Sequence, residues 1–113
     1  MTVNGKPFAV VPYTIRNNDI VRFDSPAATN AGYLQDLKDD FDVHYIEAGT
    51  RRRMMSISMH DRISGIPGRV KLVEGFIRYA QKQKGVVLMR KDEIAKWAYP
   101  RPTSLMKPDP LRF

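Results

Sequence analysis

The sequence predicts an α/β fold in which about three parallel strands alternate with helices. Three observations support this: apolar runs of strand length, amphipathic stretches of helical length between them, and glycine- and proline-rich turns at the boundaries. Alternation of this kind favours parallel strands joined by right-handed crossovers. A closed barrel of the common form needs about eight strands, so the three expected strands are too few to close one.

The expected strands are short and apolar. Residues 8–12 form a valine-rich run. In residues 53–59 the side chains alternate, with three apolar residues on one face and serines on the other. The third run, residues 86–90, reads Val-Val-Leu-Met-Arg. Valine enrichment and strict alternation are typical of strands.

Three helices are expected between and after these strands. Apolar residues recur at near-helical spacing in residues 31–45 and again in residues 69–84. Their members are Leu34, Leu37, Phe41 and Val43 or His44 in the first, and Leu72, Phe76, Ile77 and Ala80 in the second. Gly85 is expected to end the second helix as a C′ glycine. Asp92 is expected to cap a third helix that runs to about Tyr99.

Length and composition predict one partial domain with a tail. The chain has 113 residues, of which 42% are hydrophobic and 27% charged, as in an ordinary globular chain. We expect a partial domain over residues 1–99 and an extended, proline-rich tail over residues 100–113. No apolar run approaches the roughly 18 residues of a membrane span, and residues 1–7 lack the apolar core of a secretory leader. With no cysteine present, a cytoplasmic location is expected.

The positive charge raises the question of a nucleic-acid partner. The net charge is +7 and the pI is near 9.9. Apart from Arg51, Arg52 and Arg53 the basic residues are dispersed, and no reader motif is present. We therefore expect no specific nucleic-acid partner and no membrane partner, although a small basic nucleic-acid binder remains an alternative that salt dependence of binding would test.

Polar residues follow two of the expected strands. In parallel α/β folds, working residues gather at the carboxyl ends of strands. Tyr13 follows the first strand, and His60, Asp61 and Arg62 follow the second. A histidine there can act as general acid or base, an arginine can bind a carboxylate, and a tyrosine can hydrogen-bond a substrate. The structural alternative is a satisfied strand-end histidine beside a surface ion pair between Arg62 and Asp61.

Two stretches resemble the polysaccharide deacetylase family, and its allantoinase-like branch in particular. One is Val11-Pro12-Tyr13-Thr14, followed by Asn18-Asp19-Ile20 and Arg22-Phe23. The other is the longer block from Met54 to Arg69, with His60-Asp61-Arg62 at its centre and Gly65-Ile66-Pro67-Gly68 behind it. The resemblance covers roughly residues 8–98, and the histidine block is its specific part.

The resemblance implies a fold and an activity. The fold would be the carboxy-terminal portion of a (β/α) barrel of the polysaccharide deacetylase type. Family members hydrolyse carbon–nitrogen bonds other than peptide bonds, so the substrate would be an N-acetyl sugar or a cyclic ureide, with no cofactor in this portion. The late histidine of the family protonates the leaving group, which gives that role to His60. Substrate-binding residues would be Tyr13, Asn18, Asp19, Arg22 and Arg62.

The sequence also departs from the family. Metal-using members carry an early aspartate pair and a spaced histidine pair, whereas the two histidines here, His44 and His60, lie far apart. Asp39 and Asp40 fall inside an expected helix and are interpreted as a solvated face. We therefore expect no metal site and no activity from the isolated chain. The alternative is a non-catalytic half-barrel that pairs with itself or a partner through its open sheet edges.

Overall fold

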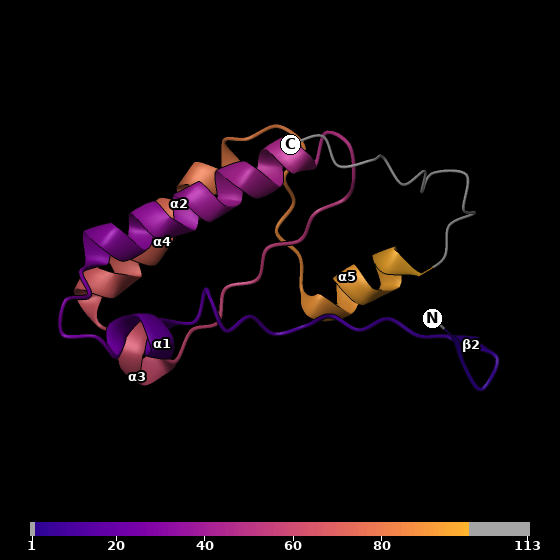
Figure 1. Cartoon of the computed structure of the whole chain (residues 1–113), viewed down its shortest axis with the longest axis horizontal. Coiled ribbons are helices and arrows are strands. Elements are labelled where there is room, and N and C mark those ends of the chain that lie inside the picture. The colour runs from indigo at the N-terminus through magenta and orange to yellow at the C-terminus, as the bar shows by residue number, and fades with distance from the viewer. Residues whose placement is uncertain (1, 100–113) are drawn as a thin grey trace. The chain divides into compact units, whose positions relative to one another are not determined.

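The computed structural model describes residues 2–99 (Figure 1). These residues fall into two compact units. The larger unit comprises residues 13–87, and the smaller one comprises residues 2–12 together with residues 88–99. The expected tail, residues 100–113, lies outside the described residues, and the expected domain boundary at residue 99 stays a prediction.

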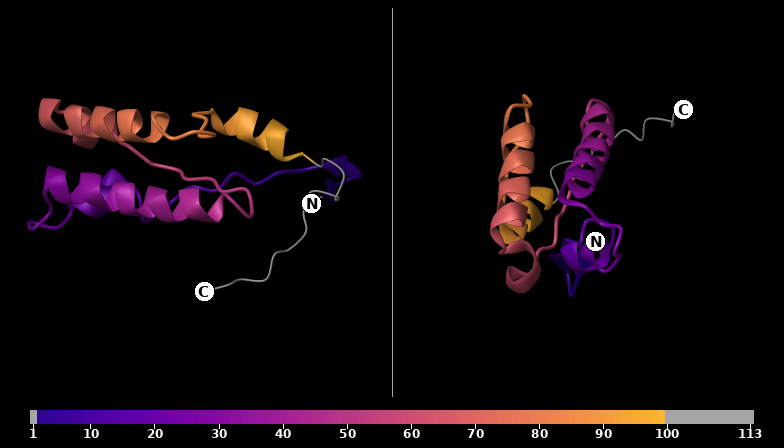
Figure 2. Two further views of the ribbon diagram at one scale, coloured as in Figure 1. Left: turned by 90° about the horizontal axis from the view of Figure 1, so that it is seen from above. Right: turned by 90° about the vertical axis from the view of Figure 1, so that its left-hand side faces the viewer.

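Two long helices form the body of the larger unit. Helix α2 spans Asn30–Glu47 and helix α4 spans Pro67–Gln81. The hydroxyl of Thr29 accepts a hydrogen bond from the backbone N–H of Gly32 at 3.0 Å, which caps α2, and Pro67 begins α4. The two helices run side by side in the same direction (Figures 1 and 2). Both helices were predicted from the apolar spacing, and both predictions are confirmed.

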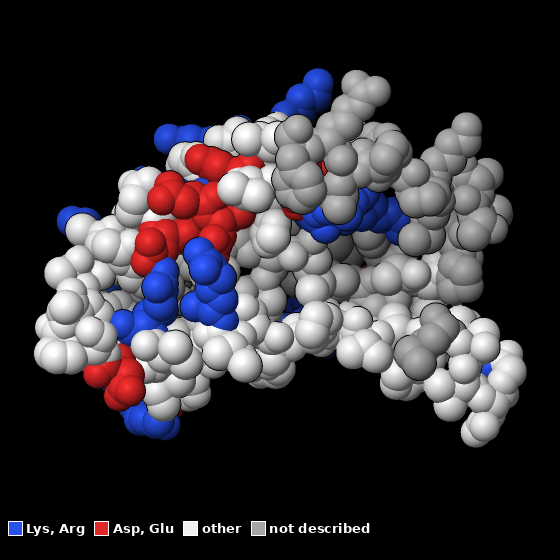
Figure 3. All heavy atoms as spheres, viewed as in Figure 1, with Lys and Arg blue, Asp and Glu red and all other residues white. Residues whose placement is uncertain are grey.

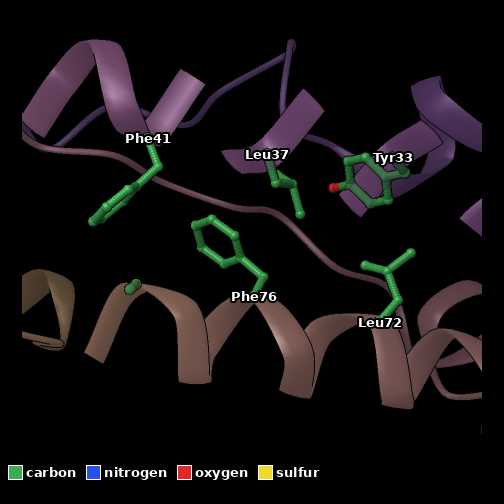
Figure 4. Close-up of a cluster of buried hydrophobic side chains, with 6 residues drawn as sticks. Tyr33, Leu37, Phe41, Leu72 and Phe76 are labelled. Atoms are coloured by element: carbon green, nitrogen blue, oxygen red, sulfur yellow. The ribbon is translucent and has the colours of Figure 1, made fainter. Parts of the chain in front are cut away.

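The hydrophobic core lies between these helices. It consists of residues at every fourth position of each helix (Figure 4), namely Tyr33, Leu37 and Phe41 from α2 and Leu72, Phe76 and Ala80 from α4. This spacing places three side chains of one helix on the same face. The rings of Phe41 and Phe76 meet edge to face, with centroids 5.9 Å apart. Met55 and Ile57, from the extended segment between the helices, pack against the cluster.

Two short helices lie at one end of this pair (Figure 1). Helix α1 spans Asp19–Phe23 and helix α3 spans Asp61–Ser64. Neither short helix is among the elements predicted from the sequence. Gly65 ends α3 by donating its backbone N–H to the carbonyl oxygen of Asp61 at 2.8 Å. A side chain at position 65 would collide with that oxygen, so the turn requires glycine.

The three expected parallel strands do not form within residues 2–99. Residues 8–12, 53–57 and 86–90 run without regular strand pairing, and Val10 and Val87 are 68% and 71% exposed. A single parallel bridge joins Asn18 and Ser58. An extended segment becomes a strand only where a neighbouring segment pairs with it. A central parallel strand is buried only when other strands and helices flank it. The described residues do not supply those neighbours, so the apolar runs stay extended and unpaired.

Helix boundaries differ from the expected ones by a few residues. Helix α4 ends at Gln81, three residues before the expected end. Gly85 does have a positive φ of 84°, but it shapes the turn after the helix and does not cap it. Helix α5, Lys91–Ala98, is capped at Arg90, whose N–H donates to the carboxylate of Glu93 at 2.8 Å, while Asp92 lies in the first turn.

The smaller unit contains a hairpin that the sequence prediction missed. Strand β1, Thr2–Val3, pairs antiparallel with strand β2, Lys6–Pro7. Asn4 and Gly5 form the turn, with φ values of 49° and 72°. Positive φ at both positions is what a two-residue hairpin turn needs, and Asn-Gly is its strongest sequence signal.

None of the helices within residues 2–99 is long and apolar enough to cross a membrane. The expected cytoplasmic location stays a prediction.

Leu37→Ala should lower the free energy of unfolding by about 3 kcal/mol, because it removes a nearly fully buried side chain from the α2–α4 interface. Val43→Ala is the matched control, since Val43 lies on the same helix and is 55% exposed; its effect should stay below about 1 kcal/mol. Chemical denaturation followed by circular dichroism measures both. Equal effects of the two substitutions would contradict this account of the core.

Candidate functional site

The centre of the candidate site is the carboxylate of Asp19, which is 0% exposed. Its Oδ2 accepts a hydrogen bond from the backbone N–H of His60 at 2.7 Å and another from the hydroxyl of Ser64 at 2.6 Å. Its Oδ1 lies 2.6 Å from Nδ1 of the His60 ring. Three bonds thus join the start of α1 to the turn that contains His60 and Ser64.

The local fold places these groups by pairing two segments. The N–H of Ser58 donates to the carbonyl of Asn17 at 2.9 Å, and the N–H of Asp19 donates to the carbonyl of Ser58 at 3.1 Å. The side chain of Asn18 caps α1 by accepting from the N–H of Ile20 at 3.2 Å. Because the pairing is parallel, the residues that follow the bridge on each side, Asp19 and His60, reach the same end.

The charge of Asp19 is stabilised by its hydrogen bonds. Burial alone would raise the pKa of the Asp19 carboxyl, but the bonds that it accepts from Ser64 and His60 outweigh burial and hold the pKa below its usual value. Burial, together with the negative charge of Asp19, raises the pKa of the nearby Tyr33 hydroxyl to about 12. The carboxylate therefore stays ionised at neutral pH.

An ionised carboxylate next to Nδ1 fixes the state of the His60 ring. The carboxylate can only accept, so Nδ1 carries a proton toward it in both the neutral and the charged ring. The second nitrogen, Nε2, is then the one that gains or loses a proton. No partner for Nε2 is found within residues 2–99, and the side chain of His60 is 36% exposed.

His60 lies at the edge of a cavity of about 380 Å³. The cavity wall is mostly apolar and includes Met59, Val70, Val73 and Ile77. Glu74 and Ser64 also line it. A histidine with one nitrogen held by a buried carboxylate and the other nitrogen free for a proton, beside a cavity, can serve as a general acid or base.

The other predicted site residues lie in different surroundings. Arg22 forms an ion pair with Asp36 of α2, and its guanidinium lies 5.7 Å from the centre of the Tyr33 ring. Tyr13 is 80% exposed. Arg62 is exposed, and its backbone N–H, not its side chain, bonds to the Asp61 carboxylate at 2.7 Å.

Asp19 differs most from its expected placement. The resemblance suggested that it would bind substrate, but the carboxylate is sealed beneath His60 and does not line the cavity. The parallel bridge between Asn18 and Ser58 turns it inward, where His60 and Ser64 satisfy it. This location favours a role in orienting His60.

The sequence analysis missed two residues near this centre. Ser64 follows His60 by four residues, the spacing of one helical turn, and that spacing was the available signal. Tyr33 precedes Leu37 by four residues on the apolar face of α2, and the same periodicity would have found it.

The described residues do not supply a metal site. Within residues 2–99 no group of three or more histidine, cysteine or acidic side chains gathers. Asp40 bonds to Arg16 at 2.8 Å, and Asp39 accepts from Gln35 at 2.7 Å on the surface of α2. His44 lies half-buried in the last turn of the same helix. These residues do not fit the ligand sets of metal-using deacetylases, so we derive no step through a metal.

Acidic side chains on the face shown in Figure 3 lie next to basic ones. The ion pairs of this part of the chain include Arg16 with Asp40 and Arg22 with Asp36. Arg51 and Arg53 both contact Glu47. Glu47, the last residue of α2, therefore partly neutralises the arginine run that follows it, which does not favour a continuous phosphate-binding track.

Comparison with known proteins shows which proteins this chain is similar to. No family model matches the chain. A Schizosaccharomyces pombe protein named "Putative polysaccharide deacetylase" is 30% identical over 100 residues, which are 86% of this chain. A crystal structure of a "probable Polysaccharide deacetylase" from Pseudomonas aeruginosa PAO1 matches 76% of this chain with 40% identity and a TM-score of 0.70. The chain is a homologue of the polysaccharide deacetylases.

The match to the polysaccharide deacetylases is partial on their side. The chain spans 31% of the fission-yeast protein and 29% of the Pseudomonas protein. The resemblance expected from the sequence is thus confirmed at the level of the polysaccharide deacetylase family. The allantoinase-like branch and the roles of individual residues stay predictions.

The free energy of unfolding should decrease as the pH is lowered, because of Asp19. Its folded pKa lies below the unfolded value of about 3.9, so its contribution is complete above that value and is lost as pH falls through the folded pKa. Asp40 acts in the same direction, because the hydrogen bond from Arg16 lowers its pKa. Unfolding titrations between about pH 6 and pH 2 should therefore show a shallower pH dependence for Asp19→Asn than for wild type.

Asp24→Asn is the control for this measurement, because Asp24 follows α1 directly and is exposed. Its pH dependence should match wild type. A wild-type slope in Asp19→Asn would show that Asp19 is not preferentially ionised in the folded chain.

Proposed function

We propose that the chain is part of a hydrolase that cleaves non-peptide carbon–nitrogen bonds, with His60 as the general acid. The observation that carries the proposal is the bond between buried Asp19 and Nδ1 of His60, beside a cavity. The relationship to the polysaccharide deacetylases supports the reaction class.

The proposed step is protonation of the leaving nitrogen. After water has added to the acyl carbon, the tetrahedral intermediate expels an amine only if nitrogen gains a proton. His60 donates the proton on Nε2 to that nitrogen while the carbon–nitrogen bond breaks, which leaves a carboxylic acid, an amine and a neutral imidazole. Asp19 holds the ring by Nδ1 throughout and stabilises its charged form.

The cavity beside His60 suggests how a substrate is held. Its apolar wall, with Met59, Val70 and Val73 among its residues, suits an acyl methyl group or the apolar face of a ring. We propose an N-acetyl sugar or a cyclic ureide as substrate, the latter if the chain is of the allantoinase-like branch. Tyr13 and Arg62 are exposed, and we propose that both contact the substrate. Asn18 and Arg22 are engaged in the helix cap and the ion pair, so we assign them to supporting the site.

His60→Ala should lower hydrolysis at least a hundredfold, within the roughly 10²–10⁴-fold that a general acid contributes. Because the chain spans 29% of its Pseudomonas homologue, the assay uses a chimera in which this chain replaces the matching part of that protein. Acetate release from N-acetylated sugar oligomers and ring opening of a cyclic ureide are both measured.

His44→Ala is the control variant, since His44 is the only other histidine and lies on α2. It should keep nearly full activity. Activity of His60→Ala within about tenfold of the unsubstituted chimera would remove the general-acid role.

A second candidate function is a non-catalytic half-barrel that associates with itself or a partner. It is favoured by the apolar residues exposed on unpaired segments, Val10 and Val87 among them. Exposed, unpaired strand edges invite pairing with another chain. We expect the 113-residue chain to have a mass in solution above its monomer value of 13.0 kDa, measured by light scattering at several concentrations. A monomer at every concentration would remove this candidate.

A further inference from the structure

Ser64 is the third group on the buried carboxylate of Asp19. Its hydroxyl donates to Oδ2 at 2.6 Å, and the residue is 7% exposed. The same oxygen accepts the backbone N–H of His60 at 2.7 Å. Oδ1 is left for the His60 ring. His60 and Ser64, which are four residues apart, therefore both contact the carboxylate.

The turn does not depend on the hydroxyl. The backbone N–H of Ser64 donates to the carbonyl of His60 at 2.8 Å, and the N–H of Gly65 donates to the carbonyl of Asp61 at 2.8 Å. These bonds close α3 whatever side chain stands at position 64. A buried hydroxyl that is not needed for the turn is better explained by the carboxylate that it reaches.

We propose that Ser64 is a positioning residue that sets the acid strength of His60 through Asp19. The inference rests on the proposed role of His60 as general acid. By donating to Oδ2, Ser64 neutralises part of the negative charge of the carboxylate and fixes the plane in which Oδ1 faces Nδ1. The carboxylate of Asp19 then attracts the positive charge of the protonated His60 ring less strongly.

The direction of the effect follows from the charges. Without the hydroxyl, more of the negative charge of Asp19 acts on the ring, and a nearby negative charge favours the charged form of a histidine. His60 would hold its proton more tightly and be a weaker acid. The other titratable groups close to the ring are Asp61 on α3 and Glu74 on α4, both of which line the same cavity, and Tyr33, which interacts with Asp19. Ser64→Ala leaves all three unchanged.

The test is the titration of His60 in the 113-residue chain, followed by NMR of the imidazole carbons and nitrogens. Ser64→Ala should move the titration midpoint of His60 upward by about half a pH unit, less than the full strength of a hydrogen bond to a charged group, because the effect reaches the ring only through Asp19. Ser64→Thr keeps the hydroxyl and should stay near wild type. In the chimera, the pH profile of hydrolysis should shift upward by the same amount in Ser64→Ala.

Ser58→Ala is the matched control. Ser58 is also 7% exposed and lies two residues before His60, but its hydroxyl has no hydrogen-bond partner within the described residues. It should leave the midpoint in place. If Ser64→Ala does not fold by circular dichroism, Ser64→Cys, which keeps a weaker donor, should give a smaller upward shift.

A midpoint in Ser64→Ala that stays within about 0.1 unit of wild type, or moves downward, would overturn the proposal. Because the titration does not depend on hydrolysis, its outcome is separate from that of the general-acid proposal. An upward shift without any hydrolysis by the chimera would support the coupling of Ser64 to His60 and count against the catalytic role of His60.

Discussion

The carboxylate of Asp19 is the interaction around which the candidate site is built. It is fully buried, and three donors satisfy it: the backbone and ring of His60 and the hydroxyl of Ser64. A buried charge without such partners would be strongly unfavourable. The same bonds that allow Asp19 to be buried therefore also determine where His60 lies and which of its nitrogens is available.

The rest of the larger unit supports that arrangement. The core between α2 and α4 fixes the two helices, and Met55 and Ile57 attach the intervening segment to it. That segment continues through Ser58, whose backbone pairs with Asn17 and Asp19, to His60. The site is thus anchored to the most buried part of the chain by a few residues of extended backbone.

The extended segments lack, within residues 2–99, the neighbours that a parallel sheet needs. Parallel strands are stable when neighbours pair with both edges and helices cover both faces. Within residues 2–99 only one parallel bridge is formed, and several valines and Leu88 remain exposed. The homologues are about three times as long, since the chain spans 29% and 31% of them. The proposed general acid and the apolar cavity beside it are one part of a hydrolytic site, and hydrolysis by the whole protein is likewise our proposal.

The sequence by itself determined the two long helices and singled out His60 as a candidate site residue. Apolar spacing predicted α2 and α4, because periodicity is local, and the position of His60 after an apolar run, with the family resemblance, singled it out. Sequence could have found the hairpin at Asn4 and Gly5, whose turn chemistry is also local. Only the tertiary structure decided that Asp19 is buried beneath His60 and that Ser64 completes the carboxylate's partners. Those facts depend on a pairing between residues about forty positions apart, and burial depends on which segments meet in space, which no local pattern specifies.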